Sequence, residues 1–170
     1  MSVSEARAAA AQPGRGPMRV QLVNCYVGAA ADVLATETGG AVSRAGLQLQ
    51  QDPYTSEDVT AMLGVSGSLA GSFYLSMSEA TALAIVSKML GQPQESFDEL
   101  AQSGIAELSN VIAGTAGVAL SDIGYTTNIT PPLLLVGAGA RLSSVEIQRL
   151  VVPLETTCGS IKVHVALREA

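Results

Sequence analysis

Two polar residues three positions apart, Glu107 and Asn110, are the residues of this chain whose types and spacing most clearly suggest chemistry. They lie within the segment 97–116, whose apolar periodicity predicts a helix. On a helix, a spacing of three places both side chains about one turn apart on the same side. Their neighbours are unusually small, and Gly114 and Gly117 follow farther along. A carboxylate and an amide held on such a smooth helix can enter another protein's active site and position water there.

Glycine is unusual in a helix interior, and Gly114 and Gly117 each cost roughly 1 kcal/mol relative to alanine. A helix that accepts this cost either packs closely on a neighbour or leaves room for another molecule to approach. Glu107 and Asn110 are therefore either a site or solvated surface residues beside glycines that accommodate a second helix. The periodicity predicts a core face made of Leu100, Gly104, Leu108, Val111, Ile112, Thr115 and Ala119, and an opposite face made of Glu99, Ser103, Ala106, Asn110, Gly114 and Gly117, with Glu107 at the border.

The composition of the chain suits one globular domain with a full core, since 48% of the 170 residues are hydrophobic. We assign this domain to residues 18–170. Residues 1–17 mix Ala, Gly and Pro with arginines and contain no continuous apolar stretch, so we expect a disordered lead-in and no signal peptide. The net charge of −6 argues against nucleic-acid binding. No run of about 18 apolar residues occurs, so we expect no membrane span and a cytoplasmic protein.

The residues that most often bind metals or form disulfides are few in this sequence. Cys25 and Cys158 are the only cysteines, and they lie far apart in apolar settings, which favours two buried thiols. His164 is the only histidine, and alternation places it opposite the apolar face of the last strand, so we expect it at the surface. The sequence therefore predicts no metal site of its own.

The elements that must position the central helix can be read from periodicity and turn signals. Ser78 is a predicted N-cap, and Gly91-Gln-Pro93 ends the helix that follows it. Ser96 and Glu99 form a possible capping box for the central helix, which runs to about Asp122. A further helix is predicted at 18–38, and strands at 42–50, 58–67, 69–77, 133–136, 150–156 and 161–168. This order, α-β-β-β-α-α-β-β-β, predicts an α+β fold with a largely antiparallel six-stranded sheet packed against three helices.

The order of these segments from Gln21 to Leu167 resembles the CheX-type chemotaxis phosphatases of the CheC/CheX/FliY superfamily. The resemblance is carried by Asn24 and by the segments 65–79, 84–91, 105–114, 124–132, 133–137, 152–156 and 159–167. It departs from the CheC type in the first helix, where Gln21-Leu-Val-Asn24 lacks the glutamate of a second ExxN motif. We therefore expect one site per chain.

The resemblance implies a protein that removes the phosphoryl group from a phosphorylated CheY-like response regulator in chemotaxis or motility signalling. In that family the ExxN residues are the working pair, and here they match Glu107 and Asn110. Asn110 would orient the attacking water, and Glu107 would dock on the regulator's lysine. Ser103, Ala106, Gly114 and Gly117 would form the docking face. The resemblance also implies a homodimer built through sheet edges and no cofactor of the chain's own, because the regulator brings its magnesium.

Two other classes of function fit the same residues. The chain can be a non-catalytic module that binds a receiver or a motility component without hydrolysis. It can also be an assembly domain whose sheet edges pair with partners. Regulator binding with an unchanged phosphoryl lifetime would favour the first class, and a large assembly insensitive to Glu107→Ala would favour the second.

Overall fold

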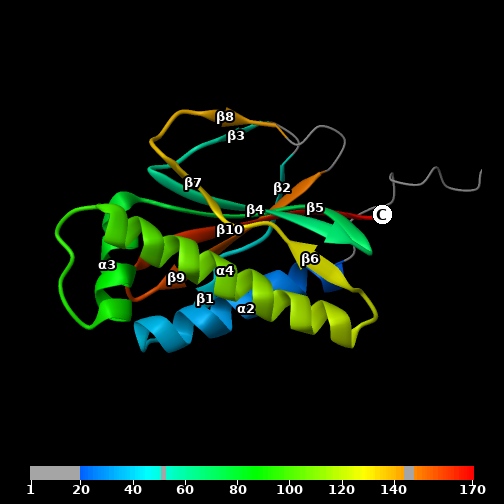
Figure 1. The fold of residues 1–170 in the computed structure, drawn as a ribbon, viewed down its shortest axis with the longest axis horizontal. Coiled ribbons are helices and arrows are strands. Elements are labelled where there is room, and N and C mark those ends of the chain that lie inside the picture. The colour runs from blue at the N-terminus through cyan, green and yellow to red at the C-terminus, as the bar shows by residue number, and fades with distance from the viewer. Residues whose placement is uncertain (1–19, 51–52, 144–147) are drawn as a thin grey trace, which may run out of the picture.

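The computed structural model describes residues 20–50, 53–143 and 148–170, so the predicted lead-in at 1–17 lies outside the described residues. Three helices and ten strands make up this part of the chain (Figure 1). The helices are α2 (Val20–Thr38), α3 (Glu79–Leu90) and α4 (Glu99–Asp122). The strands are β1 (Ser43–Arg44), β2 (Gln48–Gln50), β3 (Tyr54–Thr55), β4 (Val59–Gly67), β5 (Leu69–Met77), β6 (Thr127–Ile129), β7 (Leu133–Val136), β8 (Arg141–Leu142), β9 (Arg149–Thr156) and β10 (Gly159–Glu169).

The predicted α+β architecture is confirmed, with the helices packed on one face of an antiparallel sheet (Figure 1). The sheet has eight strands rather than the expected six, in the order β1-β9-β10-β5-β4-β6, with β2 also on β9 and β7 also on β4. One reason is that the strand predicted at 42–50 is two short strands. Gly46 lies between them with a φ of 121°, a conformation that interrupts extended backbone. Strands β3 and β8 form a separate two-stranded sheet.

The main core lies between the sheet and the helices. Alternating residues of the long strands point toward the helices, as their period of two requires. Tyr26 of α2 contacts Phe73 of β5 with ring centroids 5.0 Å apart. The largest fully buried side chains of this core include Tyr26, Leu34, Leu63, Phe73, Leu75, Met77, Ile85, Ile105, Leu108, Ile112 and Leu120.

The opposite face of the sheet is also covered, which corrects the prediction for His164. Its side chain is only 2% exposed. Tyr54 of β3 packs against it with ring centroids 4.7 Å apart, and Ser76 Oγ lies 2.8 Å from His164 Nε2. The last strand alternates as predicted, but a segment more than a hundred residues earlier covers the polar face of that strand.

The capping predictions for α3 are confirmed and that for α4 is wrong. Ser78 caps α3 by accepting a hydrogen bond from the Thr81 amide, and Gly91 ends it in the left-handed conformation. Helix α4 begins instead after Asp98, whose side chain accepts from the Ala101 amide at 3.0 Å. A carboxylate at this position caps the helix and also complements its dipole.

The predicted core face of α4 is displaced by about one residue. The buried positions are Ala101, Ile105, Leu108, Ser109, Ile112, Ala113, Ala116 and Leu120. Leu100 is 51% exposed, Val111 is 40% exposed, and Thr115 is exposed as well. Hydrophobicity alone places the large residues inward, whereas close packing of α4 on the sheet and on α2 buries small side chains instead. Among the described residues α4 is the one helix with the length and composition to cross a membrane. A helix that packs in the core of a globular protein can have the same length and composition, and one side of α4 is buried in this way.

Candidate functional site

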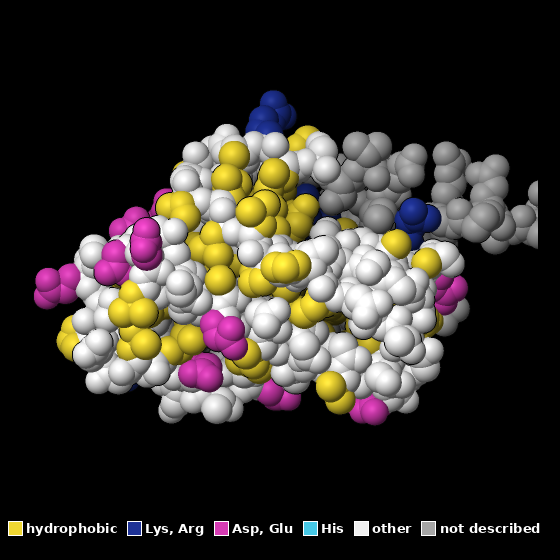
Figure 2. Space-filling view, in the orientation of Figure 1, with side chains coloured by type: hydrophobic (Ala, Val, Ile, Leu, Met, Phe, Trp, Pro, Cys, Tyr) yellow, Lys and Arg dark blue, Asp and Glu magenta, His cyan; other side chains and the backbone are white. Residues whose placement is uncertain are grey.

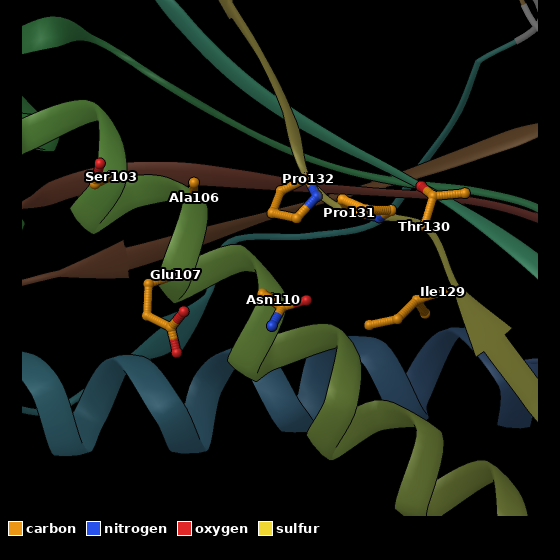
Figure 3. A pocket seen from close by; sticks show the side chains of 8 residues that line it. All are labelled: Ser103, Ala106, Glu107, Asn110, Ile129, Thr130, Pro131 and Pro132. Carbon is orange, nitrogen blue, oxygen red and sulfur yellow. The ribbon is translucent and has the colours of Figure 1, made fainter. Parts of the chain in front are cut away.

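An open groove lies between α4 and the turn that joins β6 to β7, with a volume of about 490 Å³ (Figure 3). The α4 side contributes polar or small residues, and the turn contributes mainly apolar ones. Its lining is Ser103, Ala106, Glu107, Asn110, Ile129, Thr130, Pro131 and Pro132. The groove thus brings together two segments about twenty residues apart in the sequence.

Glu107 and Asn110 both line this groove, and their spacing of three places them on the same side of α4. Glu107 is exposed and Asn110 is half-buried. Figure 3 shows the Asn110 amide on the side of α4 that faces Ile129. No side-chain hydrogen bond or ion pair joins either residue to the described part of the chain, so both remain free to bind another molecule.

The residues next in sequence to this pair hold the helix in place. Leu108 and Ser109 are both buried, and the Ser109 hydroxyl donates to the Ala106 carbonyl at 2.8 Å. One turn before Glu107, a Cβ added to Gly104 would lie 3.1 Å from Val86 Cγ2, which shows how closely α4 approaches α3. The backbone that carries Glu107 and Asn110 is therefore anchored from the opposite side.

Two of the four predicted docking residues line the groove and two lie outside it. Ser103 and Ala106 line the groove beside the polar pair. Gly114 and Gly117 lie farther along α4, outside the groove. Gly114 is exposed, and a Cβ added to it would meet no atom within 4 Å. A Cβ on Gly117 would lie 3.7 Å from Thr127 Oγ1, so this glycine allows ordinary contact with β6.

The four residues of the opposite wall, Ile129, Thr130, Pro131 and Pro132, were missed as site residues. Their sequence signal was a proline pair directly before the predicted strand at 133–136, which by itself indicates only a turn. Nothing in the sequence alone indicates that this turn faces α4.

The asparagine of the first helix has a different environment from Asn110. Asn24 Oδ1 accepts hydrogen bonds from Arg44 Nη1 at 3.2 Å and Nη2 at 3.3 Å. Its acceptor oxygen is therefore already used within the chain. Asn24 therefore differs from Asn110, whose side chain makes no hydrogen bond within the described residues, and one site per chain stays a prediction.

The other potential metal ligands, nucleophiles and bases among the described residues are either far from one another or buried. The described residues contain no group of three His, Cys, Asp or Glu side chains arranged to hold a metal ion. Cys25 and Cys158 are free thiols, both half-buried, and burial raises the pKa of Cys25. Ser76 and His164 form a hydrogen-bonded pair of the kind found in hydrolases, but both side chains are buried. Burial, with smaller effects of Arg149 and Lys162, lowers the pKa of His164 to about 3.

Comparison with known proteins shows the family to which the sequence is similar. The family model described as chemotaxis phosphatase CheX matches residues 59–155, which include α4 and the groove turn. A curated relative, the CheY-P phosphatase CheX of Thermotoga maritima, is 37% identical over 87 residues, which are 51% of this chain and 56% of that protein. The match therefore spans little more than half the length of this relative.

Two solved structures that are each 26% identical extend the similarity to most of the chain. A CheC-like superfamily protein from Shewanella sp. PV-4 has a TM-score of 0.81 over 89% of this chain and 99% of its own. The CheX–CheY–BeF3–Mg²⁺ complex from Borrelia burgdorferi has a TM-score of 0.70 over 89% of this chain and 100% of its own. Since the family model covers more than half of the sequence and includes the groove, the chain belongs to the chemotaxis phosphatase CheX family.

Proposed function

We propose that this protein dephosphorylates the phospho-aspartate of a CheY-like receiver domain in chemotaxis or motility signalling. The observation that carries the proposal is the Asn110 amide, half-buried in an open groove and free of hydrogen bonds to the described residues. The family membership supports it, as do the relative named CheY-P phosphatase and the structure of a CheX–CheY complex. We further propose that the protein acts in the cytoplasm.

In this mechanism Asn110 orients the attacking water. Water adds to phosphorus while the bond between phosphorus and the aspartate oxygen breaks, which releases inorganic phosphate and the free carboxylate. The transition state is loose, so catalysis depends mainly on positioning and charge stabilisation. An amide can accept a hydrogen bond from water and donate one, and it carries no charge that would repel the phosphoryl oxygens.

Glu107 has the complementary role of docking the helix on the receiver. An exposed carboxylate one turn from Asn110 can pair with a lysine beside the phosphorylation site. The pairing fixes the register of α4, so that the amide meets the phosphoryl group. We propose that magnesium belongs to the receiver, and that Ser103 and Ala106 allow close approach because their side chains are short.

The test is the lifetime of the phosphoryl group on candidate receivers with and without the protein. We expect Asn110→Ala to lower the accelerated rate by roughly a hundredfold, since water is no longer positioned. The fold should be unchanged, because alanine favours a helix. Asn128→Ala is a matched control: Asn128 is exposed on β6 and does not line the groove. An Asn110→Ala protein that is as fast as wild type would overturn the mechanism.

The same assay separates catalysis from binding alone. A protein that binds phosphorylated receivers without shortening the phosphoryl lifetime would be a non-catalytic module of the same family. Free Glu107 and Asn110 side chains in one groove favour the catalytic alternative, because binding alone does not require a water-positioning amide beside the carboxylate.

We also propose that the protein forms a homodimer through a sheet edge. Exposed apolar residues lie at both edges: Leu49 of β2 on one side and Leu133 of β7, 64% exposed, on the other. Figure 2 shows hydrophobic side chains gathered over the region of β7. Exposed edge strands readily pair with another chain. Light scattering of Leu49→Lys and Leu133→Lys would identify the edge, and a monomeric wild type would exclude the dimer.

A further inference from the structure

The turn that forms the second wall of the groove is a bulge in an otherwise continuous edge of the sheet. Val65 of β4 pairs with Ile129 of β6, and Met62 of β4 pairs with Leu133 of β7. Between these pairs, three residues at 130–132 oppose two at 63–64. An extra residue of this kind bends the strand and redirects its side chains, and such bulges are frequent beside active sites.

Thr130 fastens this bulge to β4 by two hydrogen bonds. Its amide donates to the Gly64 carbonyl at 3.0 Å, and its Oγ1 accepts from the Gly64 amide at 2.8 Å. Gly64 permits this approach, because a Cβ there would lie 3.1 Å from Thr130 Cγ2. We refer to these two hydrogen bonds as the Thr130–Gly64 clamp.

The two prolines make the fastened wall stiff and remove its amide donors. Proline fixes its own φ and restricts the residue before it, so residues 130–132 have few alternative conformations. Neither Pro131 nor Pro132 has an N–H group that could bind water or a phosphoryl oxygen. Polar contacts in the groove are consequently supplied by α4, while Ile129 and the prolines offer apolar contact.

This division of the lining indicates what the groove accepts. On the α4 side, Glu107 is a carboxylate without a cationic partner among the described residues, and Asn110 is a free amide. The opposite wall is apolar at Ile129, Pro131 and Pro132. The complementary occupant is a loop that presents an anionic group and a lysine to the helix and an apolar surface to the turn.

From this geometry we propose that Thr130 is a positioning residue for dephosphorylation. Through the Thr130–Gly64 clamp it holds the diproline turn as a rigid wall, which presses the receiver's phosphorylated loop against Asn110. The inference rests on the proposed function and deepens it, because it assigns to the turn a role in alignment rather than in affinity. A loosened wall leaves the loop bound but poorly aligned with the water.

The test compares Thr130→Val with Thr130→Ser in the dephosphorylation assay. We expect the valine variant to lower the maximal accelerated rate by roughly tenfold, with the half-saturating protein concentration little changed. Serine keeps the hydroxyl and should restore most of the rate. Thr36→Val is the matched control, since Thr36 is exposed on α2 and its hydroxyl donates to the Asp32 carbonyl within that helix.

Amide hydrogen exchange at Gly64 gives a readout that does not depend on activity. Exchange should become faster in Thr130→Val and return toward the wild-type rate in Thr130→Ser. Unchanged exchange would disprove the clamp. Faster exchange with a wild-type maximal rate, or a change in the half-saturating concentration alone, would disprove the alignment role while the proposed function stands. A wild-type protein that accelerates no receiver would instead refute the proposed function itself, and the alignment role with it.

Discussion

Two polar regions of this molecule have opposite relations to their surroundings. In the groove, Glu107 and Asn110 are accessible and make no side-chain hydrogen bond within the described residues. On the outer face of the sheet, Ser76 and His164 are buried and bonded to each other, beneath Tyr54. The first pair is available to another molecule, whereas the second pair is buried and its one side-chain hydrogen bond is internal.

The contrast shows that residue type is a poor guide to function without accessibility. A serine bonded to a histidine resembles a nucleophile with its base more closely than Glu107 and Asn110 resemble any catalytic pair. Yet His164 is 2% exposed, and no acidic side chain lies within hydrogen-bond distance of its Nδ1 among the described residues. Arg149 is also buried, with its guanidinium carbon 5.3 Å from the centre of the Tyr54 ring, and the charges of Arg149 and Lys162 further lower the pKa of His164.

The largest effect expected on stability tests whether the cluster of Ser76 and His164 on the outer face of the sheet is shielded from solvent. The pKa of His164 is lowered to about 3 by burial, against an ordinary value near 6.5, so the unfolded state binds the proton first as pH falls. The contribution of neutral His164 to the free energy of unfolding is therefore fully present well above pH 6.5. The free energy of unfolding should decrease by about 2 kcal/mol between pH 7 and 5. Denaturant unfolding at several pH values measures this.

His164→Gln is the control for that measurement, because it removes the only histidine of the sequence. This variant should show a much flatter pH dependence between pH 7 and 5, since no other side chain with an ordinary pKa near 6.5 is present. An equally steep decrease in the variant would assign the effect to other groups. A wild type that is equally stable at both pH values would show that His164 is not buried in its neutral form.

The second effect tests whether the groove pair serves a partner. Glu107→Gln should raise the half-saturating concentration for a phosphorylated receiver about tenfold, because a charge-assisted hydrogen bond becomes a neutral one. The maximal rate should change far less. Glu95→Gln, an exposed residue between α3 and α4, makes the same change in net charge and should have no effect. If both variants behave alike, only the overall charge of the protein matters.

The smallest effect concerns the continuation of the docking face along α4. Gly114→Ala should raise the free energy of unfolding by up to about 1 kcal/mol, because alanine favours a helix and the added methyl group meets no atom within 4 Å. If the receiver approaches α4 closely at this position, the same change should weaken docking. Gly28→Ala in α2 is the matched control, since that glycine is equally open. Stabilisation by both variants with unaltered docking would remove Gly114 from the docking face.

The sequence by itself determined the local elements and the common side of the functional pair. The cap at Ser78, the stop at Gly91 and the hairpin of β4 and β5 depend on neighbouring residues, whose conformational preferences act over a few positions. Glu107 and Asn110 share one side of α4 because the helix period is fixed. The Asp98 cap was missed because two adjacent candidate caps compete within the same few residues.

Only the tertiary structure decided which surfaces were covered and which stayed open. His164 became buried because β3 packs over the outer face of the sheet, and Leu100 remained exposed because small residues of α4 fit closer to its neighbours. The second wall of the groove came from the bulge at Thr130, which lies against α4 only once β6 and β7 pair with β4. Such contacts join segments distant in the chain, and local periodicity carries no information about them.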